Sequence, residues 1–224
     1  MHLICDLHKT LLRPVESHGC FIGREMPEVA PARLDAELGQ VLERVDHEPG
    51  NLRIKWELNG PDRGLSRNRW ASLLFEVVER ILGRPCDAAR LRDICIASYD
   101  RLASPGQWEP YADTQMTLHA LLQKGHTVSL LSNFDARGDR LILECLGDVA
   151  WQRIDLSHRT GLLKPESAAF LAHCRLLSLL PAAALMVGDD PWQDGCARTV
   201  GLAFAQVSYP DVSLRNAVEG LLHG

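Results

Sequence analysis

Short apolar runs alternate with helical patterns from about residue 111 to the C-terminus, and this alternation limits the fold more than any other feature. Short apolar runs predict strands, whereas apolar residues that recur every three or four positions predict helices. The expected strands cover residues 128–131, 151–156, 184–187 and 202–207, and the expected helices cover residues 114–124, 137–146, 165–177, 192–200 and 212–222. Such alternation implies right-handed crossovers and a parallel sheet. We therefore expect an α/β fold with helices on both faces of the sheet.

The N-terminal half of the chain is organised differently. MHLIC, residues 1–5, is expected to be the first strand of the same sheet. From about residue 31 to residue 102 the apolar residues follow helical spacing, with a further helix expected over residues 87–102. This helical block is then an insertion between the first strand and the rest of the sheet, placed as a lid over the strand ends.

One segment inside the helical block has the pattern of a strand. In NLRIKWEL, residues 51–58, apolar residues alternate with charged ones. We expect an extended connector with one partly buried face. The alternative is a flap or edge strand, followed by the turn residues NGPDRG.

Composition excludes several classes of partner. The 224 residues suffice for one domain or for a core with an inserted domain. A net charge of −5, with no basic block, argues against a nucleic-acid partner. The longest apolar run, LLSLLPAAALMV, is too short to span a bilayer and contains a proline. We therefore expect a soluble cytoplasmic protein with no membrane partner.

The seven cysteines form no CxxC pair, and most of them lie within apolar patterns. We expect them to be small buried side chains in a reducing compartment rather than a disulfide framework.

Polar residues that follow the expected strands are the candidates for a functional site, because ligands of parallel sheets bind at the carboxyl ends of the strands. These residues are Asp6, His8 and Thr10 after the first strand, Ser132 and Asn133 after the second, Lys164 before a helix, and Asp189, Asp190 and Asp194 after the strand ALMV. They combine carboxylates, small hydrogen-bond donors and one cation. Such a set suits a phosphoryl group beside Mg²⁺, which prefers oxygen ligands.

Each element of this set also has an ordinary structural interpretation. An Asp after a strand, or a Ser-Asn pair in a loop, is common turn chemistry. Lys164 could be a solvated lysine at a helix entry, and GDDPWQDG could be the capped start of a helix. The order and spacing of all four motifs together favour a functional site.

The four motifs resemble those of the haloacid dehalogenase-like hydrolase superfamily. CDLHKTL is similar to its DxDxT loop, VSLLSNFD to its Ser/Thr-Asn loop, GLLKPES to its lysine motif, and MVGDDPWQDGCARTVGL to its GDxxxD loop. The resemblance implies a Rossmann-like core formed by residues 1–13 and 108–224, with an α-helical cap domain over residues 14–107. In phosphatases of this family the first Asp attacks phosphorus and the second Asp, two residues later, acts as acid and base.

In this resemblance Asp6 matches the family's nucleophile. His8 stands at the position where the family has its second Asp. An imidazole with a pKa near ~6.5 can transfer protons at neutral pH. A neighbouring divalent cation would lower that pKa and leave a weaker acid. The alternative is that His8 acts only through its backbone carbonyl, as the family's metal ligand from this position.

Three functions remain open at this stage. The first is a Mg²⁺-dependent phosphohydrolase for a small phosphorylated metabolite, with Asp6, His8 and Lys164 catalytic. In it Thr10, Ser132, Asn133 and Lys164 would surround the phosphate, and the metal site would draw on Asp6, His8, Asp189, Asp190 and Asp194. The second is a carbon–halogen hydrolase in which Asp6 attacks carbon, and the third is an inactive family member with a binding role.

The sequence does not identify the substrate. Cap residues that could choose it are Arg13, His18, Arg24, Lys55, Trp56, Arg63, Arg67 and Trp70, although most exposed arginines are simply solvated. We expect a monomer or a homodimer.

Overall fold

The computed structural model describes residues 1–48, 51–84 and 86–223. The chain forms two compact units, one of Met1–Arg13 with Glu109–Gly224 and one of Pro14–Trp108. Among the described residues, no helix combines the length and the apolar character that a membrane crossing requires.

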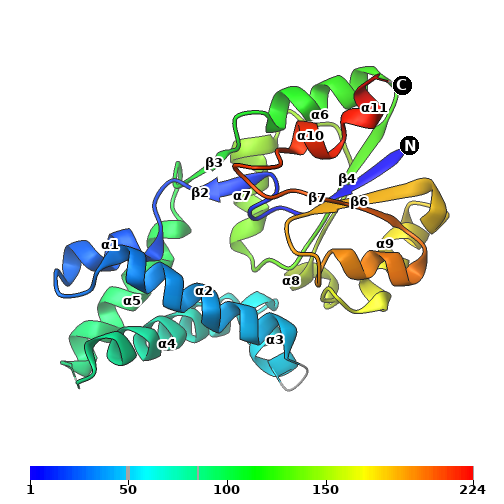
Figure 1. Ribbon diagram of the computed structural model, residues 1–224. Coiled ribbons are helices and arrows are strands. Elements are labelled where there is room, and N and C mark those ends of the chain that lie inside the picture. The colour runs from blue at the N-terminus through cyan, green and yellow to red at the C-terminus, as the bar shows by residue number, and fades with distance from the viewer. Residues whose placement is uncertain (49–50, 85, 224) are drawn as a thin grey trace. The chain divides into compact units, whose positions relative to one another are not determined.

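The first unit is built on a five-stranded sheet in the order β5-β4-β1-β6-β7 (Figure 1). The strands are β1 His2–Cys5, β4 Thr127–Ser132, β5 Trp151–Leu156, β6 Ala184–Gly188 and β7 Ala203–Gln206. All four pairings are parallel, and Cys5 at the end of β1 lies opposite Leu130 and Val187. All of β1 is buried, as expected for a central strand covered on both faces. The predicted α/β class with a parallel sheet is confirmed.

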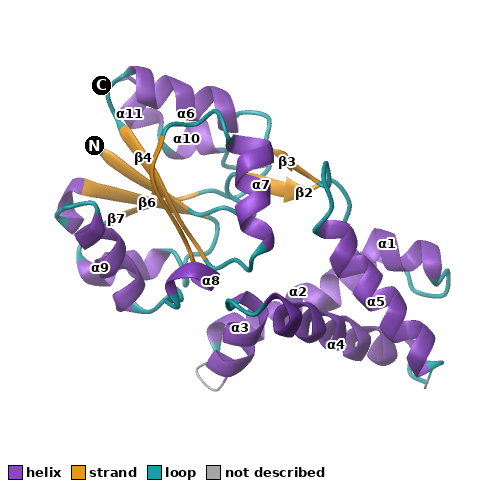
Figure 2. Ribbon diagram, turned by 180° about the vertical axis from the view of Figure 1, so that it is seen from behind, coloured by secondary structure: helices purple, strands orange, loops and turns teal. Residues whose placement is uncertain are grey.

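Helices cover both faces of this sheet, with α6, α10 and α11 on one side and α9 on the other (Figures 1 and 2). The helical elements of this unit are α6 Thr114–Gln123, α7 Arg137–Leu146, α8 Ser157–Thr160, α9 Ser167–Leu176, α10 Leu214–Ala217, α11 Glu219–His223 and the 3₁₀ turns η2 Pro181–Ala183 and η3 Gly195–Val200.

Two of the helices expected from the sequence differ in the structure. The predicted helix over residues 192–200 is a loop followed by η3, because acidic side chains and turns hold the loop. The helix expected over residues 212–222 is divided into α10 and α11.

A chain of buried polar groups joins α9 to the sheet. Ser129 Oγ lies 2.7 Å from His2 Nε2 and 2.8 Å from His173 Nε2, and His173 Nδ1 lies 2.8 Å from Asp155 Oδ2. Arg153 Nε donates to the same Asp155 oxygen at 2.6 Å. Because buried polar groups without partners cost free energy, this chain fixes α9 against β4 and β5. The segment that carries Lys164 is thereby held at both ends.

The second unit is helical. Its helices are α1 His18–Glu25, α2 Pro31–His47, α3 Leu52–Asn59, α4 Arg63–Leu82 and α5 Ala88–Leu102. Their apolar faces meet in one core that includes Leu34, Leu74, Val78 and Leu91. The ends are capped as the sequence allows. The side chain of Asp62 accepts from Leu65 N at the start of α4, and Gly83, with φ +63°, ends that helix.

The segment NLRIKWEL is helical, so both expectations for it, an extended connector or an edge strand, are wrong. The segment forms α3, in which Lys55 and Leu58, three residues apart, are buried. Arg53 and Glu57 form an i,i+4 ion pair at 2.9 Å, a spacing that brings side chains together on a helix surface but not along a strand. The apolar residues at every second position also include helical i,i+4 pairs, which is why the alternation misled.

Two short strands that the sequence did not reveal, β2 Leu12–Pro14 and β3 Trp108–Pro110, pair with each other. Each has only three residues, too few for a visible period.

Candidate active site

Lys164 binds two carboxylates from different loops. Its Nζ donates to Asp6 Oδ1 at 2.6 Å and to Asp194 Oδ1 at 2.5 Å, and all three residues are buried. Burial alone would lower the pKa of the ammonium group, but the carboxylates of Asp194 and Asp6 outweigh it and raise that pKa above its ordinary value. Lys164 is therefore a permanent positive charge between two acids.

The position of Asp6 follows from the sheet. Asp6 comes directly after β1, and its backbone N–H donates to Val187 O of β6 at 2.9 Å, which continues the ladder by one residue. Asp189 and Asp194 follow β6, the neighbouring strand. The carboxylates of these three residues reach one point, since one oxygen of each lies within 4.8 Å of the others.

The acids carry more negative charge than Lys164 balances. Burial raises the pKa of Asp189 to about 7, and the charge of Asp6 acts in the same direction. Burial likewise raises the pKa of Asp194 to about 7. The ammonium of Lys164 opposes this rise, and the charges of Asp6 and Asp189 add to it. Such a cluster has affinity for a further cation.

Gly188, which ends β6, permits the close approach of Asp194. A Cβ atom on Gly188 would lie 2.1 Å from Asp194 Oδ2 and 2.3 Å from its Cγ. No side chain fits in that space, so the Asp194 carboxylate depends on a glycine at position 188. Gly188 was not among the predicted site residues, although it is the glycine of the GDxxxD-like motif.

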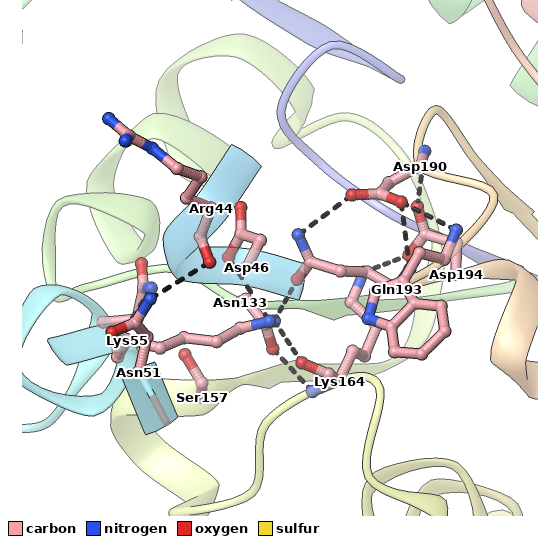
Figure 3. Close-up of polar contacts among 12 residues, drawn as sticks. Arg44, Asp46, Asn51, Lys55, Asn133, Ser157, Lys164, Asp190, Gln193 and Asp194 are labelled. Atoms are coloured by element: carbon pink, nitrogen blue, oxygen red, sulfur yellow. Dashed lines mark hydrogen bonds and ion pairs between the residues drawn. The ribbon is translucent and has the colours of Figure 1, made fainter. Parts of the chain in front are cut away.

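The side-chain amide of Asn133 holds the Lys164 backbone (Figure 3). Its Nδ2 donates to Lys164 O at 2.8 Å, and Lys164 N donates to its Oδ1 at 2.8 Å. The same Nδ2 donates to Gln193 Oε1 at 2.7 Å. Asn133 therefore fixes the loop that carries Lys164, and its expected place at the phosphate stays a prediction. Ser132, the residue before Asn133, ends β4 and is buried.

Asp190 is not a member of the acid cluster that the described residues form. Its Oδ1 accepts from the backbone N–H groups of Trp192 and Gln193 at 2.8 and 3.0 Å, and its Oδ2 accepts from Gln193 Nε2 at 3.2 Å. Asp190 therefore shapes its own loop, and Asp194 rather than Asp190 accompanies Asp189 at the carboxylate cluster.

Thr10 and His8 complete the first loop. Thr10 is fully buried, and its Oγ1 donates to Asp189 Oδ1 at 3.4 Å. Burial lowers the pKa of the His8 imidazole to about 4, and the charges of Lys9 and Arg137 add to this while Asp6 opposes it. At neutral pH the His8 ring is therefore neutral. A neutral imidazole can accept a proton but is a weak donor of one.

A family model described as haloacid dehalogenase-like hydrolase matches residues 35–197, more than half of the chain. The chain belongs to this family of hydrolases. The matched range begins after Asp6, so the assignment of the first loop rests on its geometry and on the sequence motif.

Curated relatives carry the same family description. Haloacid dehalogenase-like hydrolase domain-containing protein 3 of Mus musculus is 26% identical over 131 residues, 58% of this chain and 52% of that protein. The Bos taurus protein of the same name is 27% identical over 154 residues, 68% of this chain and 61% of that protein. The chain thus spans about half to three fifths of the length of these relatives.

Solved structures share the fold of this haloacid dehalogenase-like chain. L-2-haloacid dehalogenase from Xanthobacter autotrophicus is 20% identical, with a TM-score of 0.64 over 98% of this chain and 82% of that one. A predicted phosphoglycolate phosphatase from Haemophilus somnus 129PT is 16% identical, with a TM-score of 0.57 over 96% of this chain and 89% of that one. The family enzyme BT-2542 from Bacteroides thetaiotaomicron, solved with magnesium and inorganic phosphate, is 14% identical, with a TM-score of 0.51 over 93% and 94%. Both dehalogenases and phosphatases therefore share this fold.

The donor set of the acid cluster fits a hard divalent cation. Asp6, Asp189 and Asp194 offer three carboxylate oxygens within 4.8 Å of one another, and the raised pKa values of Asp189 and Asp194 reflect acids gathered without a balancing cation. Soft metals would favour sulfur or imidazole ligands, which this cluster does not contain among the described residues.

Mg²⁺ binding should strengthen as pH rises from about 6 to about 8, because the metal must displace protons from Asp189 and Asp194, whose pKa values are about 7. Without metal, protonation of Asp189 and Asp194 stabilises the folded state. This contribution is fully present below their unfolded pKa of about 4 and is lost as pH rises through about 7. Added Mg²⁺ should therefore raise the melting temperature more at about pH 8 than at about pH 6. Thermal unfolding against Mg²⁺ concentration at both pH values measures this. Equal Mg²⁺ effects at the two pH values, or an undiminished effect in Asp189→Asn, would place the metal elsewhere.

Proposed function

We propose that this chain is a Mg²⁺-dependent phosphohydrolase that acts on a small phosphorylated metabolite through an aspartyl-phosphate on Asp6. The observation that carries the proposal is the contact of the Lys164 ammonium with both Asp6 and Asp194. It fixes one oxygen of the Asp6 carboxylate beside the carboxylates of Asp189 and Asp194. A carboxylate held this way is oriented as a nucleophile, and the lysine offsets the repulsion between it and an incoming phosphate.

The chemistry would proceed in two displacements. One oxygen of Asp6 forms a bond to phosphorus while the bond from phosphorus to the leaving oxygen breaks, and that oxygen takes a proton from solvent. Water then adds to phosphorus as the bond to Asp6 breaks, which releases inorganic phosphate. Lys164, Ser132 and Thr10 would bind phosphate oxygens. A metal held by Asp6, Asp189 and Asp194, with the His8 carbonyl, would supply further charge stabilisation.

His8 would serve as the base of the second displacement. With its pKa lowered to about 4, the imidazole is neutral at physiological pH and can take the proton of the attacking water. It would give little help to a leaving group that needs a proton. The enzyme should therefore prefer substrates whose leaving oxygen is already a good leaving group.

A carbon–halogen hydrolase is the second candidate, and the observation that favours it is a histidine, rather than a carboxylic acid, two residues after Asp6. A halide leaves without a proton, so this reaction needs no acid at position 8. Asp6 would form an ester with the substrate carbon as the halide leaves, and water would then hydrolyse the ester. The three-carboxylate cluster favours the phosphohydrolase, because halide displacement would use Asp6 but would give Asp189 and Asp194 no role as metal ligands.

We expect the wild-type protein to hydrolyse an aryl phosphate only with Mg²⁺, and Asp6→Asn to be inactive, because an amide cannot act as the nucleophile. Phosphate release from p-nitrophenyl phosphate and a panel of phosphorylated metabolites, with Mg²⁺ or with a chelator, measures this. Asp211→Asn, an exposed acid, serves as the control and should retain wild-type activity. Halide release from a 2-haloacid without Mg²⁺, and no phosphate release with it, would select the second candidate.

His8→Ala should lower the kcat for an aryl phosphate by roughly 10²-fold, because removal of the base slows the second displacement. The variant should still release one equivalent of nitrophenol in a rapid burst, which stopped-flow absorbance records. If His8→Ala instead impaired only alkyl phosphates, the imidazole would be the acid of the first displacement. An unchanged kcat would limit the role of His8 to its backbone carbonyl.

A further inference from the structure

Gln193 lies in the loop after β6, between Asp189 and Asp194 in the sequence, and both ends of its side-chain amide form hydrogen bonds. Its Oε1 accepts from Asn133 Nδ2 at 2.7 Å, and its Nε2 donates to Asp190 Oδ2 at 3.2 Å (Figure 3). The orientation of the amide is fixed, because a flipped amide would place its oxygen against the Asp190 carboxylate. Gln193 is partly buried and contributes no oxygen to the acid cluster.

The two partners of Gln193 contact the two residues of the ion pair between Lys164 and Asp194. On one side, Asn133 binds the backbone of Lys164 through two hydrogen bonds of 2.8 Å. On the other side, Asp190 N donates to Asp194 Oδ2 at 3.2 Å, and Asp194 N donates to Asp190 O at 2.9 Å. The contact between Lys164 Nζ and Asp194 Oδ1 closes the path.

These bonds form a closed ring through five residues. The ring runs from the Lys164 backbone through Asn133, Gln193, Asp190 and Asp194, and returns to the Lys164 side chain. Within this ring, Gln193 links Asn133, which fixes the Lys164 backbone, to Asp190, which contacts Asp194. The ion pair between Lys164 and Asp194 closes the ring. Because ion-pair strength falls with distance, a ring that keeps both loops in register also keeps the charges in contact.

We propose that Gln193 is a positioning residue that couples the Lys164 loop to the acid loop, so that nucleophile, lysine and cation ligands are held in one arrangement. The inference rests on the proposed function for its catalytic consequence. The role requires a side chain that accepts at one end and donates at the other. An amide does both, and a carboxylic acid does both only while it is protonated.

The test uses Gln193→Ala and Gln193→Glu in the full chain, with the exposed Gln152→Ala and Gln152→Glu as matched controls. Isothermal titration calorimetry gives the Mg²⁺ affinity of each protein without any substrate. We expect Gln193→Ala to weaken Mg²⁺ binding by about 10-fold or more, the usual effect of removing a group that supports metal ligands. With p-nitrophenyl phosphate it should lower kcat by a similar factor and change KM less.

Gln193→Glu distinguishes positioning from mere packing. Its ionised carboxylate would repel Asp190, whereas its protonated form would restore both hydrogen bonds. The ratio of Gln193→Glu to wild-type activity should therefore rise as pH falls from about 8 to about 5, while the Gln193→Ala ratio stays flat. The variant Asn133→Ala with Gln193→Ala should lose no more than Asn133→Ala alone, since Gln193 acts on Lys164 through Asn133.

Two outcomes overturn the inference. In the first, Gln193→Ala binds Mg²⁺ as the Gln152 controls do. In the second, the activity ratio of Gln193→Glu does not depend on pH. If wild type bound Mg²⁺ but hydrolysed no phosphate ester, the proposed function would fail, and the calorimetric series would still decide the role of Gln193.

Discussion

The buried ammonium of Lys164 between Asp6 and Asp194 is the interaction on which the site depends. It joins the end of β1 to the loop after β6 through the segment that precedes α9. Three charges with almost no exposed surface are tolerable only if they are paired, and removing one partner of such a pair typically costs about 3–5 kcal/mol. The three loops are therefore tied to one another by electrostatics as well as by the sheet.

Several features outside this ion pair keep it in place. Gly188 leaves room for the Asp194 carboxylate, and the Asn133 amide fixes the Lys164 backbone. The buried contact between His173 and Asp155 joins α9 to β5, the elements on either side of the Lys164 segment. The three acids outnumber the single lysine, and the pKa values of Asp189 and Asp194 are raised for this reason and by burial. A cation that binds beside these two acids would relieve their repulsion. The repulsion among these acids lowers the stability of the fold without a cation and favours cation binding. Groups with shifted pKa values are common at functional sites.

Much of this arrangement was accessible from sequence. Continuous apolar runs such as ALMV predicted the parallel strands, and the rule that ligands bind at the carboxyl ends of parallel strands pointed to Asp6, Asp189 and Asp194. Lys164 was recognisable by its order among the motifs. The pattern failed at α3, because apolar residues at every second position also contain the i,i+4 pairs of a helix. It also could not separate Asp190 from Asp194, since neighbouring acids in a loop differ only in where the backbone aims them. Gln193 carried no signal, because an amide reveals a role only through its two partners.

The aspartyl-phosphate mechanism can be measured directly, by identifying the residue that carries phosphate during turnover. The wild-type protein is mixed with a phosphorylated substrate and Mg²⁺, quenched in acid within milliseconds, and digested for peptide mass mapping. We expect one acid-stable, hydroxylamine-sensitive acyl phosphate on Asp6, which is absent when a chelator replaces Mg²⁺. Phosphate on His8 or Ser132, or turnover with no phosphorylated peptide, would contradict it.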